Sequence, residues 1–326
     1  MIGRRSFTLA LGTAAFLPGQ TVLAANATRQ IVIRAGRPDG PYHTLAVQFA
    51  EALSIAANGA LTVDVQESPN SVQNVMDSVK LGPDTLFTAP PYLISQAHRG
   101  DKPFERNPKY DDIRSLTPIP GQTTHWLVRA DSGIGDISGL ARKPYISGAK
   151  GSLGERQTTA LLKALGIDSS VQLIDLDVSG APAAVKSGQV IGYATAGAFP
   201  IAAVTELASS LPLKILSLPE SQIKQVMASD DSLTRMTIPR GTYPGIDEAI
   251  NTVMLPAGIY TTRRMTDAVA YEITKYVWGQ REALIKRNPA WGIFSPALLP
   301  MLGAKLHRGA LRYYTEAKIS VPAALK

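Results

Sequence analysis

The most constraining feature of this sequence is a repeated order of short apolar run, turn and helical pattern. Residues 31–33 (Ile-Val-Ile) lead through the loop 36–45 (GRPDGPYHTL) into apolar residues at helical spacing. Residues 61–65 alternate like a strand and precede the loop 67–71 and a second helical pattern at 72–79. Helix N-termini that follow strands present backbone N–H groups at one edge of a sheet, which suits an anionic ligand. The alternation predicts an α/β domain with a largely parallel sheet.

A second series of the same kind begins near residue 131. Its strand and helix patterns lie, in chain order, at residues 143–147, 155–165, 171–176, 181–186 and 190–194. A later strand at 252–255 and a long helix at 267–287 follow. We therefore predict a first α/β lobe of residues 26–128 and 254–326, a second α/β lobe of residues 129–253, and a ligand cleft between them.

The first 25 residues have the pattern of a secretory signal peptide. Arg4 and Arg5 precede an apolar run at residues 9–17, and small residues end the segment at 22–25. The run is too short for a permanent membrane span. Paired arginines also permit twin-arginine export, although Gly3 departs from the usual pattern before the pair, so both export routes stay open. We expect a periplasmic protein.

Composition excludes several classes of function. The chain has no cysteine, which rules out disulfides, thiolate catalysis and cysteine metal sites. Removing the leader takes away two arginines and lowers the net charge from +7 to +5. The basic residues are scattered and lack a nucleic-acid-binding pattern, so we expect no nucleic-acid partner. A mild positive field favours anionic small molecules.

No motif organises catalysis. The sequence has neither a G-x-S-x-G elbow nor an H-E-x-x-H helix. The glycines at 148, 151 and 154 lack the Lys-Ser/Thr ending of a phosphate-binding loop, and the four histidines lack metal-ligand spacing. We predict a protein that is not an enzyme, with no catalytic residue, metal or cofactor.

Several ordered segments carry a family pattern over nearly the whole chain beyond the leader. They are residues 36–42 (GRPDGPY), 68–74 (SPNSVQN), 128–133 (VRADSG), 148–152 (GAKGS), 195–200 (TAGAFP), 238–245 (IPRGTYPG) and 307–314 (HRGALRYY). Together they resemble the TAXI family of solute receptors of tripartite ATP-independent periplasmic (TRAP) transporters. The resemblance implies a two-lobe, type II-like periplasmic-binding-protein fold that closes on a small organic anion or amino acid. It also implies delivery of that ligand to a TRAP-type membrane permease.

A different class of partner remains open. A periplasmic sensor subunit that presents its ligand to a signalling receptor would bind and close in the same way. We expect a monomer in either case.

Two departures from the family pattern bear on the ligand. Pro41 stands in the opening loop, where it removes one N–H that could hold an anion. The loop at residues 88–91 reads Thr-Ala-Pro-Pro, where the family pattern carries Gln-Ser-Asp. Losing that carboxylate removes a partner for a ligand ammonium, so we expect a carboxylate without an amino group.

The candidate ligand-binding residues come from both series. They are Tyr42, Thr44, Asn70, Ser71, Thr88, Lys150, Gly151, Ser152, Thr195, Ala196, Gly197 and Tyr243. Several have a structural alternative, whereas binding is favoured for Gly151, Ser152 and Thr195. Tyr42 either walls the ligand or packs, Asn70 and Ser71 either cap their helix or donate to the ligand, and Lys150 either pairs with a carboxylate or is solvated. Tyr243 is either a hinge-side contact or part of a turn.

Overall fold

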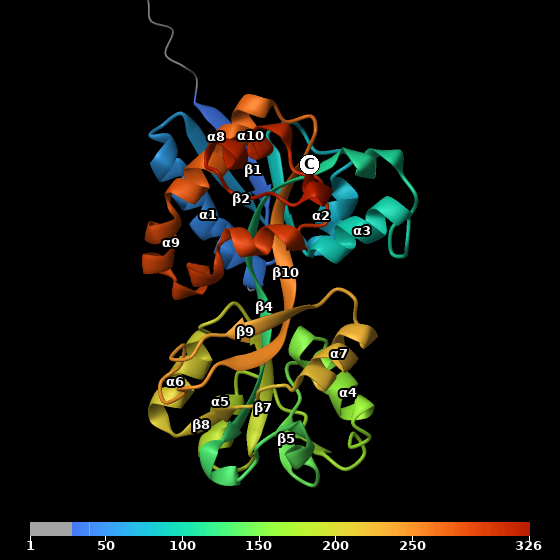
Figure 1. Cartoon of the computed structure of the whole chain (residues 1–326), viewed down its shortest axis with the longest axis vertical. Helices are drawn as coiled ribbons and strands as arrows, with labels where there is room; N and C mark the ends of the chain where they lie inside the picture. The colour runs from blue at the N-terminus through green and yellow to red at the C-terminus, as the bar shows by residue number, and fades with distance from the viewer. Residues whose placement is uncertain (1–27, 39) are drawn as a thin grey trace, which may run out of the picture.

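The computed structural model describes residues 28–38 and 40–326. The predicted signal peptide, residues 1–25, lies outside the described residues, as does Asp39 in the opening loop. No helix in the described part of the chain is long and apolar enough to cross a membrane. Two lobes are stacked along the longest axis and are joined by extended strands (Figure 1). The predicted α/β class with two lobes is confirmed.

Three parallel strands form the outer part of the first-lobe sheet. They are ordered β2 (Leu61–Gln66), β1 (Arg29–Arg34) and β3 (Thr85–Ala89). Each strand leads into one helix: α1 (Pro41–Ala57), α2 (Ser71–Asp77) and α3 (Pro91–Arg99). α1 covers one side of the strands, and α2 and α3 cover the other (Figure 1). The N-termini of these helices therefore follow the carboxyl ends of parallel strands, as the sequence pattern predicted.

Two long strands run through both lobes. β4 (Ile113–Arg129) and β10 (Ile250–Thr262) pair antiparallel with each other. In the described chain they unite one ten-stranded sheet, whose main path is β2-β1-β3-β10-β4-β7-β5-β6. The predicted limit of the first lobe at residue 128 falls at the far end of β4, because residues 123–128 already pair with β7 of the second lobe.

The second lobe repeats the plan of the first. Its strands are β5 (Pro144–Ile146), β6 (Gln172–Leu173), β7 (Gly192–Gly197), β8 (Leu213–Ile215) and β9 (Thr234–Ile238). Its helices are α4 (Leu153–Ala164), α5 (Ala181–Lys186), α6 (Ala202–Ser210) and α7 (Glu220–Ser229). β8 pairs with β4 and β9 pairs with β10, so the long strands also belong to the sheet of this lobe.

After β10 the chain returns to the first lobe. α8 (Asp267–Gly279), α9 (Arg281–Arg287) and α10 (Arg308–Glu316) pack there. The single helix predicted at 267–287 is two helices, because the chain breaks at Gly279 and Gln280. Glycine is a poor helix former, which explains the break. Short 3-10 turns complete the fold: η1 (Pro108–Asp112), η2 (Ala130–Ser132), η3 (Ile137–Leu140), η4 (Pro289–Ile293), η5 (Pro296–Met301) and η6 (Ala323–Leu325).

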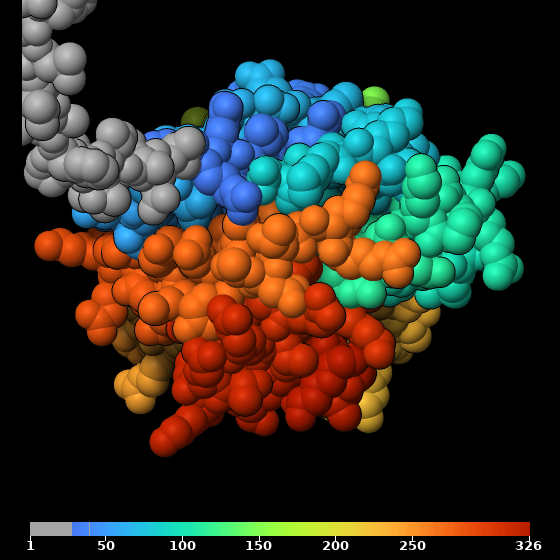
Figure 2. Space-filling model, turned by 90° about the horizontal axis from the view of Figure 1, so that it is seen from above, coloured from blue at the N-terminus to red at the C-terminus, as the bar shows by residue number. Residues whose placement is uncertain are grey.

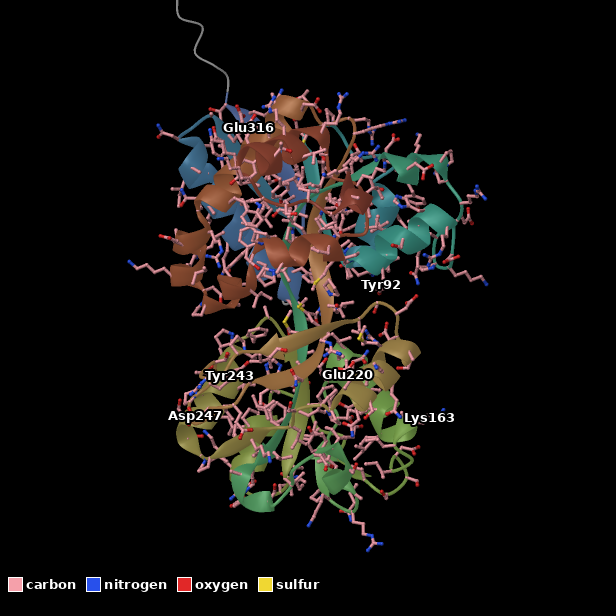
Figure 3. The ribbon with its side chains drawn as sticks, in the orientation of Figure 1. Tyr92, Lys163, Glu220, Tyr243, Asp247 and Glu316 are labelled. Atoms are coloured by element: carbon pink, nitrogen blue, oxygen red, sulfur yellow. The ribbon has the colours of Figure 1, made fainter. Side chains whose placement is uncertain are left out.

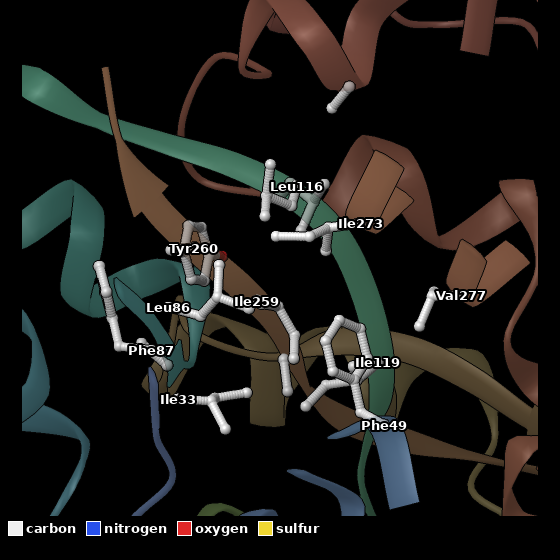
Figure 4. Close-up of a cluster of buried hydrophobic side chains, with 14 of the residues drawn as sticks. Ile33, Phe49, Leu86, Phe87, Leu116, Ile119, Ile259, Tyr260, Ile273 and Val277 are labelled. Atoms are coloured by element: carbon white, nitrogen blue, oxygen red, sulfur yellow. The ribbon is translucent and has the colours of Figure 1, made fainter. Parts of the chain in front are cut away.

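The described residues bury three apolar clusters. The first-lobe cluster gathers Ile33 of β1, Phe49 of α1, Leu86 of β3 and Ile273 of α8 around the long strands (Figure 4). The second lobe holds one cluster on each face of its sheet. Trp126 of β4 belongs to one and its neighbour Leu127 to the other, because successive strand residues point to opposite faces.

The long strands approach closely where they pass between the lobes. A Cβ on Gly121 would lie 2.5 Å from the carbonyl oxygen of Leu255 and 2.9 Å from the Met254 side chain. The register of the pair shifts between Leu255 and Ala257, which places Pro256 in a bulge. Proline lacks an N–H and fits a bulge because no ladder bond is needed there. The boundary between the lobes is thus a local break in an otherwise continuous strand pair.

We predict that Gly121→Ala destabilises the protein, because the added methyl group has no space between β4 and β10. The free energy of unfolding, measured by urea denaturation, should fall by about 1–3 kcal/mol. Gly279→Ala is the matched control, since a Cβ there meets no atom within 4 Å. Equal effects of the two substitutions would contradict the close approach.

Candidate functional site

The loops after β1 and β3 open toward the lobe boundary. Ala89 at the end of β3 pairs with Gly258 of β10, two residues from the bulge at Pro256. α1 and α3 begin after these loops, and each has proline at its first position and tyrosine at its second. Proline suits the first position of a helix because that N–H has no intrahelical partner. Tyr42 and Tyr92 are therefore carried by helix N-termini at this edge.

Tyr42 is buried beside the crossing strand. Burial raises the pKa of its hydroxyl, the adjacent Gln122 side chain lowers it, and Tyr92 raises it again. These neighbours place Tyr42, Gln122 and Tyr92 together at the lobe boundary. No described residue completes a well-formed hydrogen bond to the buried Tyr42 hydroxyl. Buried polar atoms are nearly always paired, so this hydroxyl is available to a ligand or a water molecule.

Tyr92 connects the two lobes. It packs against the first-lobe cluster and also against the Trp126 cluster of the second lobe. In Figure 3 it lies at the margin of the first lobe that faces the second. Burial raises the pKa of Tyr92, the positive charge of Arg156 lowers it, and the negative charge of Asp230 raises it. A cation and a carboxylate of the second lobe therefore both act on this hydroxyl.

Arg156 belongs to the first turn of α4. Ser152 caps this helix by accepting a bond from the Glu155 N–H at 3.2 Å. The Glu155 carboxylate accepts the Gly151 N–H, which is thereby occupied, and Arg156 Nη1 donates to the Gly151 carbonyl at 2.9 Å. Arg156 is exposed and has no ion pair among the described residues, so its remaining donors are free. Lys150, in the preceding turn, is exposed and likewise unpaired within the described chain.

The end of β7 lies next to the start of α4. A Cβ on Gly154 would sit 3.3 Å from the Thr195 backbone, so helix and strand are in close contact. Thr195, Ala196 and Gly197 are partly exposed and pair with His125, Thr124 and Thr123 of β4. The structure thus brings together the predicted segments around Ser152 and Thr195.

Two further buried polar atoms near the boundary lack partners in the described chain. They are Oγ1 of Thr124 and Oε1 of Gln157. Gln157 is held by its other end, because Nε2 donates to Asp230 Oδ2 at 2.9 Å. Thr124 is on the same face of β4 as Trp126, whose indole N–H donates to Thr158 of α4. Acceptors and hydroxyls are thus left available on the α4 side of the crossing strand.

A cavity between the lobes adjoins Tyr92. Its volume is about 490 Å³. The first lobe contributes residues of α3, and the second contributes the turn between α7 and β9 at residues 231–234. Pro256 of the bulge also lines it. The volume is within the range of small-molecule sites.

Acidic groups are present at this site, which the sequence reasoning did not anticipate. Asp230 faces Tyr92 from the second lobe, and Asp231 lines the cavity. The loop at residues 88–91 has no acid, and these acids come instead from the turn after α7, which the topology folds against α3. The expectation of a carboxylate without an amino group stays a prediction.

The other first-lobe candidates occupy structural positions. Asn70 caps α2, with its Oδ1 accepting the Gln73 N–H at 2.9 Å, and Ser71 is the first residue of that helix. Thr88 is fully buried, and its hydroxyl is 3.5 Å from the Arg34 carbonyl. Thr44 is exposed in the first turn of α1. Thr44 and Tyr42 lie in the first turn of α1, and Asn70 and Ser71 lie at the start of α2, so both pairs follow the carboxyl ends of parallel strands.

Tyr243 lies within the second-lobe core. It is 2% exposed, and Figure 3 shows it in the interior of that lobe. Its hydroxyl accepts the Ile201 N–H at 3.0 Å and is 2.8 Å from Nε2 of His125. Nδ1 of His125 is 2.9 Å from the Thr123 carbonyl. If Nδ1 carries the imidazole proton and donates it to the Thr123 carbonyl, Nε2 is an acceptor and the Tyr243 hydroxyl donates to it. This chain of hydrogen bonds connects the loop before α6 to the crossing strand.

We predict that Tyr243→Phe destabilises the fold, because it leaves the Ile201 N–H and Nε2 of His125 without their partner. The free energy of unfolding should fall by about 1–3 kcal/mol in urea denaturation. Tyr313→Phe is the control, because no hydrogen bond from its hydroxyl occurs within the described chain. An unchanged stability of Tyr243→Phe would contradict the network.

We predict that stability falls below neutral pH because of His125. Burial lowers the pKa of this imidazole from its ordinary value of 6.5 to about 4. The unfolded chain therefore binds the proton more tightly, and the stabilisation present above pH 6.5 is lost as the pH falls toward 4. The contribution between pH 7 and pH 5 is about 2 kcal/mol. His125→Gln should show a smaller loss over that range, and an identical loss would contradict a neutral buried His125.

Tyr92, Gln122, Arg156 and Asp230 are not among the candidate residues predicted from the sequence. A signal for Tyr92 was present, because Pro91-Tyr92 repeats the dipeptide Pro41-Tyr42 after another strand. Gln122 and Asp230 have no comparable signal. No group of three or more His, Asp or Glu in the described part of the chain could hold a metal ion.

Known proteins share this architecture. The chain is similar to a TctC solute binding protein from Polaromonas, at 13% identity and a TM-score of 0.52, covering 90% of this chain and 99% of that chain. It is also similar to MatC from Rhodopseudomonas palustris with bound malate, at 13% identity and a TM-score of 0.49, covering 89% and 97%. The first likeness confirms the predicted two-lobe periplasmic-binding-protein fold. The model of the NMT1-like family matches residues 33–317, and the chain belongs to that family.

Proposed function

We propose that this protein is an extracytoplasmic solute receptor that captures a small organic anion between its two lobes. The observation that carries the proposal is the meeting of Tyr42 and Tyr92 with Arg156 at the lobe boundary, beside a cavity lined by both lobes. The buried Tyr42 hydroxyl lies beside Gln122 and has no hydrogen bond of full geometry in the described chain, and Arg156 keeps donors that its bond to Gly151 does not use. Hinge closure around such a site would exclude water and strengthen these contacts.

The ligand that this site favours is a carboxylate. A guanidinium can hold a carboxylate through two parallel bonds, which a lysine cannot. The N-termini of α1, α3 and α4 add favourable dipoles. Gly151 contributes less than the sequence suggested, because Glu155 already accepts its N–H. We infer that Arg156 is the main cation and that Lys150 assists it.

An amino acid is a second candidate ligand. Asp230 and Asp231 supply negative charge opposite Tyr92 and in the cavity, where an ammonium group would be stabilised. Asp230 Oδ1 already accepts the Ser232 N–H at 3.0 Å, so Asp231 is the less constrained of the two. Binding experiments can therefore distinguish an amino-acid ligand from a simple carboxylate.

The sequence resemblance supports a finer proposal. We propose that the protein is a TAXI receptor, exported to the periplasm by the segment at residues 1–25, and that it delivers its ligand to a TRAP-type permease. The described residues of the site include no organised pair of nucleophile and base, so we expect binding without chemical conversion. Reconstituted transport with the purified permease would test the partner.

Thermal-shift titration with dicarboxylates, keto acids and amino acids tests the ligand class. Binding to the folded state raises the melting temperature, and about 3 kcal/mol of stabilisation is expected at a hundredfold excess over the dissociation constant. A shift with keto acids or dicarboxylates supports a carboxylate without an amino group. A shift with amino acids alone would support an amino acid as the ligand instead. If none of the three compound classes shifts the melting temperature, the proposal of an organic anion is contradicted.

We predict that Arg156→Gln weakens binding of the best ligand about 10- to 100-fold, because a charge-assisted bond is lost. Tyr92→Ala should weaken it as well, and Lys150→Gln by a smaller factor. Lys163→Gln is the control, because Lys163 is in the last turn of the same helix (Figure 3). Calorimetry of the four variants measures the affinities. Equal affinity of Arg156→Gln and Lys163→Gln would exclude Arg156 from the site.

A further inference from the structure

A second pocket lies in the first lobe, at the end away from the second lobe. Its volume is about 320 Å³, and its lining consists entirely of ionisable residues. We call it the arginine pocket, and it is formed by Arg114, Arg263, Asp267, His307 and Arg308. The start of β4, the end of β10 and the starts of α8 and α10 meet here. Figure 2 looks onto this end of the lobe, where the orange and red segments lie side by side.

Two of the arginines already have carboxylate partners. Arg263 Nε is 2.7 Å from Asp112 Oδ1, and Arg308 Nη2 is 3.1 Å from Asp267 Oδ2. These pairs leave little net charge. Each pair uses only part of the donor set of its guanidinium group, so further N–H groups can reach an anion in the pocket.

Arg114 provides the excess positive charge. It is half-buried, and no carboxylate of the described chain lies within 4 Å of it. Its Nη1 donates to the carbonyls of Asp111 and Ile113 at 2.7 and 2.8 Å, which fixes the side chain. Its other guanidinium N–H groups have no hydrogen bond within the described chain. A fixed and half-buried cation without a counter-ion is a stronger anion site than a mobile surface lysine.

His307 forms the uncharged floor of the pocket. It is buried, Nε2 is 3.0 Å from the Met265 carbonyl, and Nδ1 accepts the Gly309 N–H at 3.2 Å. Burial lowers the pKa of His307, as do the charges of Arg114 and Arg308, whereas the Met265 carbonyl and Asp267 raise it. The imidazole is therefore neutral at pH 7, and the pocket keeps its positive charge through the arginines alone.

We propose that the arginine pocket binds a phosphate group, independently of the solute cleft. Guanidinium groups match phosphate oxygens in bidentate geometry, and three of them converge here. α8 and α10 both begin at the pocket, which adds the positive ends of two helix dipoles. A volume of about 320 Å³ is at the lower end of small-molecule sites and admits a phosphate with a short substituent. Free phosphate and the headgroup of a phospholipid share this chemistry.

Titration of the full chain with inorganic phosphate, followed by NMR of the Gly309 and Arg308 amides, tests the proposal. The amide shifts should saturate, and Arg114→Gln should weaken binding at least about tenfold, because the unpaired charge is removed. Arg308→Gln should also weaken it, and this exposed residue can be changed without disturbing the core. Arg312→Gln is the matched control, since Arg312 pairs with Glu316 one turn further along α10, outside the pocket.

Sedimentation with phosphatidylglycerol vesicles separates the two sources of phosphate. Arg114-dependent binding of vesicles without binding of inorganic phosphate would support the lipid headgroup, and the reverse would support free phosphate. Absence of saturable binding to both, or equal binding by Arg114→Gln and Arg312→Gln, would overturn the proposal. Neither outcome bears on the solute cleft, because the arginine pocket shares no residue with it.

Discussion

The antiparallel pairing of β4 with β10 is the interaction on which the rest of the structure depends. Both strands carry residues of the core in each lobe, so neither lobe is complete without them. β3 borders this pair in the first lobe and β7 in the second, which places the ends of both strands near the boundary. The pairing is interrupted at only one level between the lobes, at Gly121 and Pro256.

The site follows from that arrangement. Strands that end at the boundary are followed by helices that begin there. Tyr42, Tyr92 and Arg156 therefore come close to one another from three different helices. The first lobe contributes mostly hydroxyls and the second contributes charge. If these residues hold the proposed ligand, each lobe contributes only part of the contacts, and we expect closure to be coupled to binding. The hydrogen bonds of Tyr243 to Ile201 and His125 connect the loop before α6 to β4 inside the second lobe.

Periodic segments were predictable from the sequence, and contacts between distant segments were not. α1 and α5 follow their apolar patterns closely, and α5 has the predicted bounds. The 17-residue β4 was not predicted at its full length, and its Pro118 pairs in register with Gly258 of β10. The sequence around Tyr243 is typical of a turn, but tertiary packing buries its side chain. Asp230 reaches the site only through the fold, since no local pattern marks it.

The central claim is that one ligand is held at once by Tyr92 of the first lobe and Arg156 of the second. A crystal structure of the protein with the best ligand from the titrations measures this most directly. We expect ligand density between these two side chains, with a carboxylate on the Arg156 guanidinium and the lobes closed over it. Density confined to one lobe, or at a position that Arg156 does not contact, would contradict it.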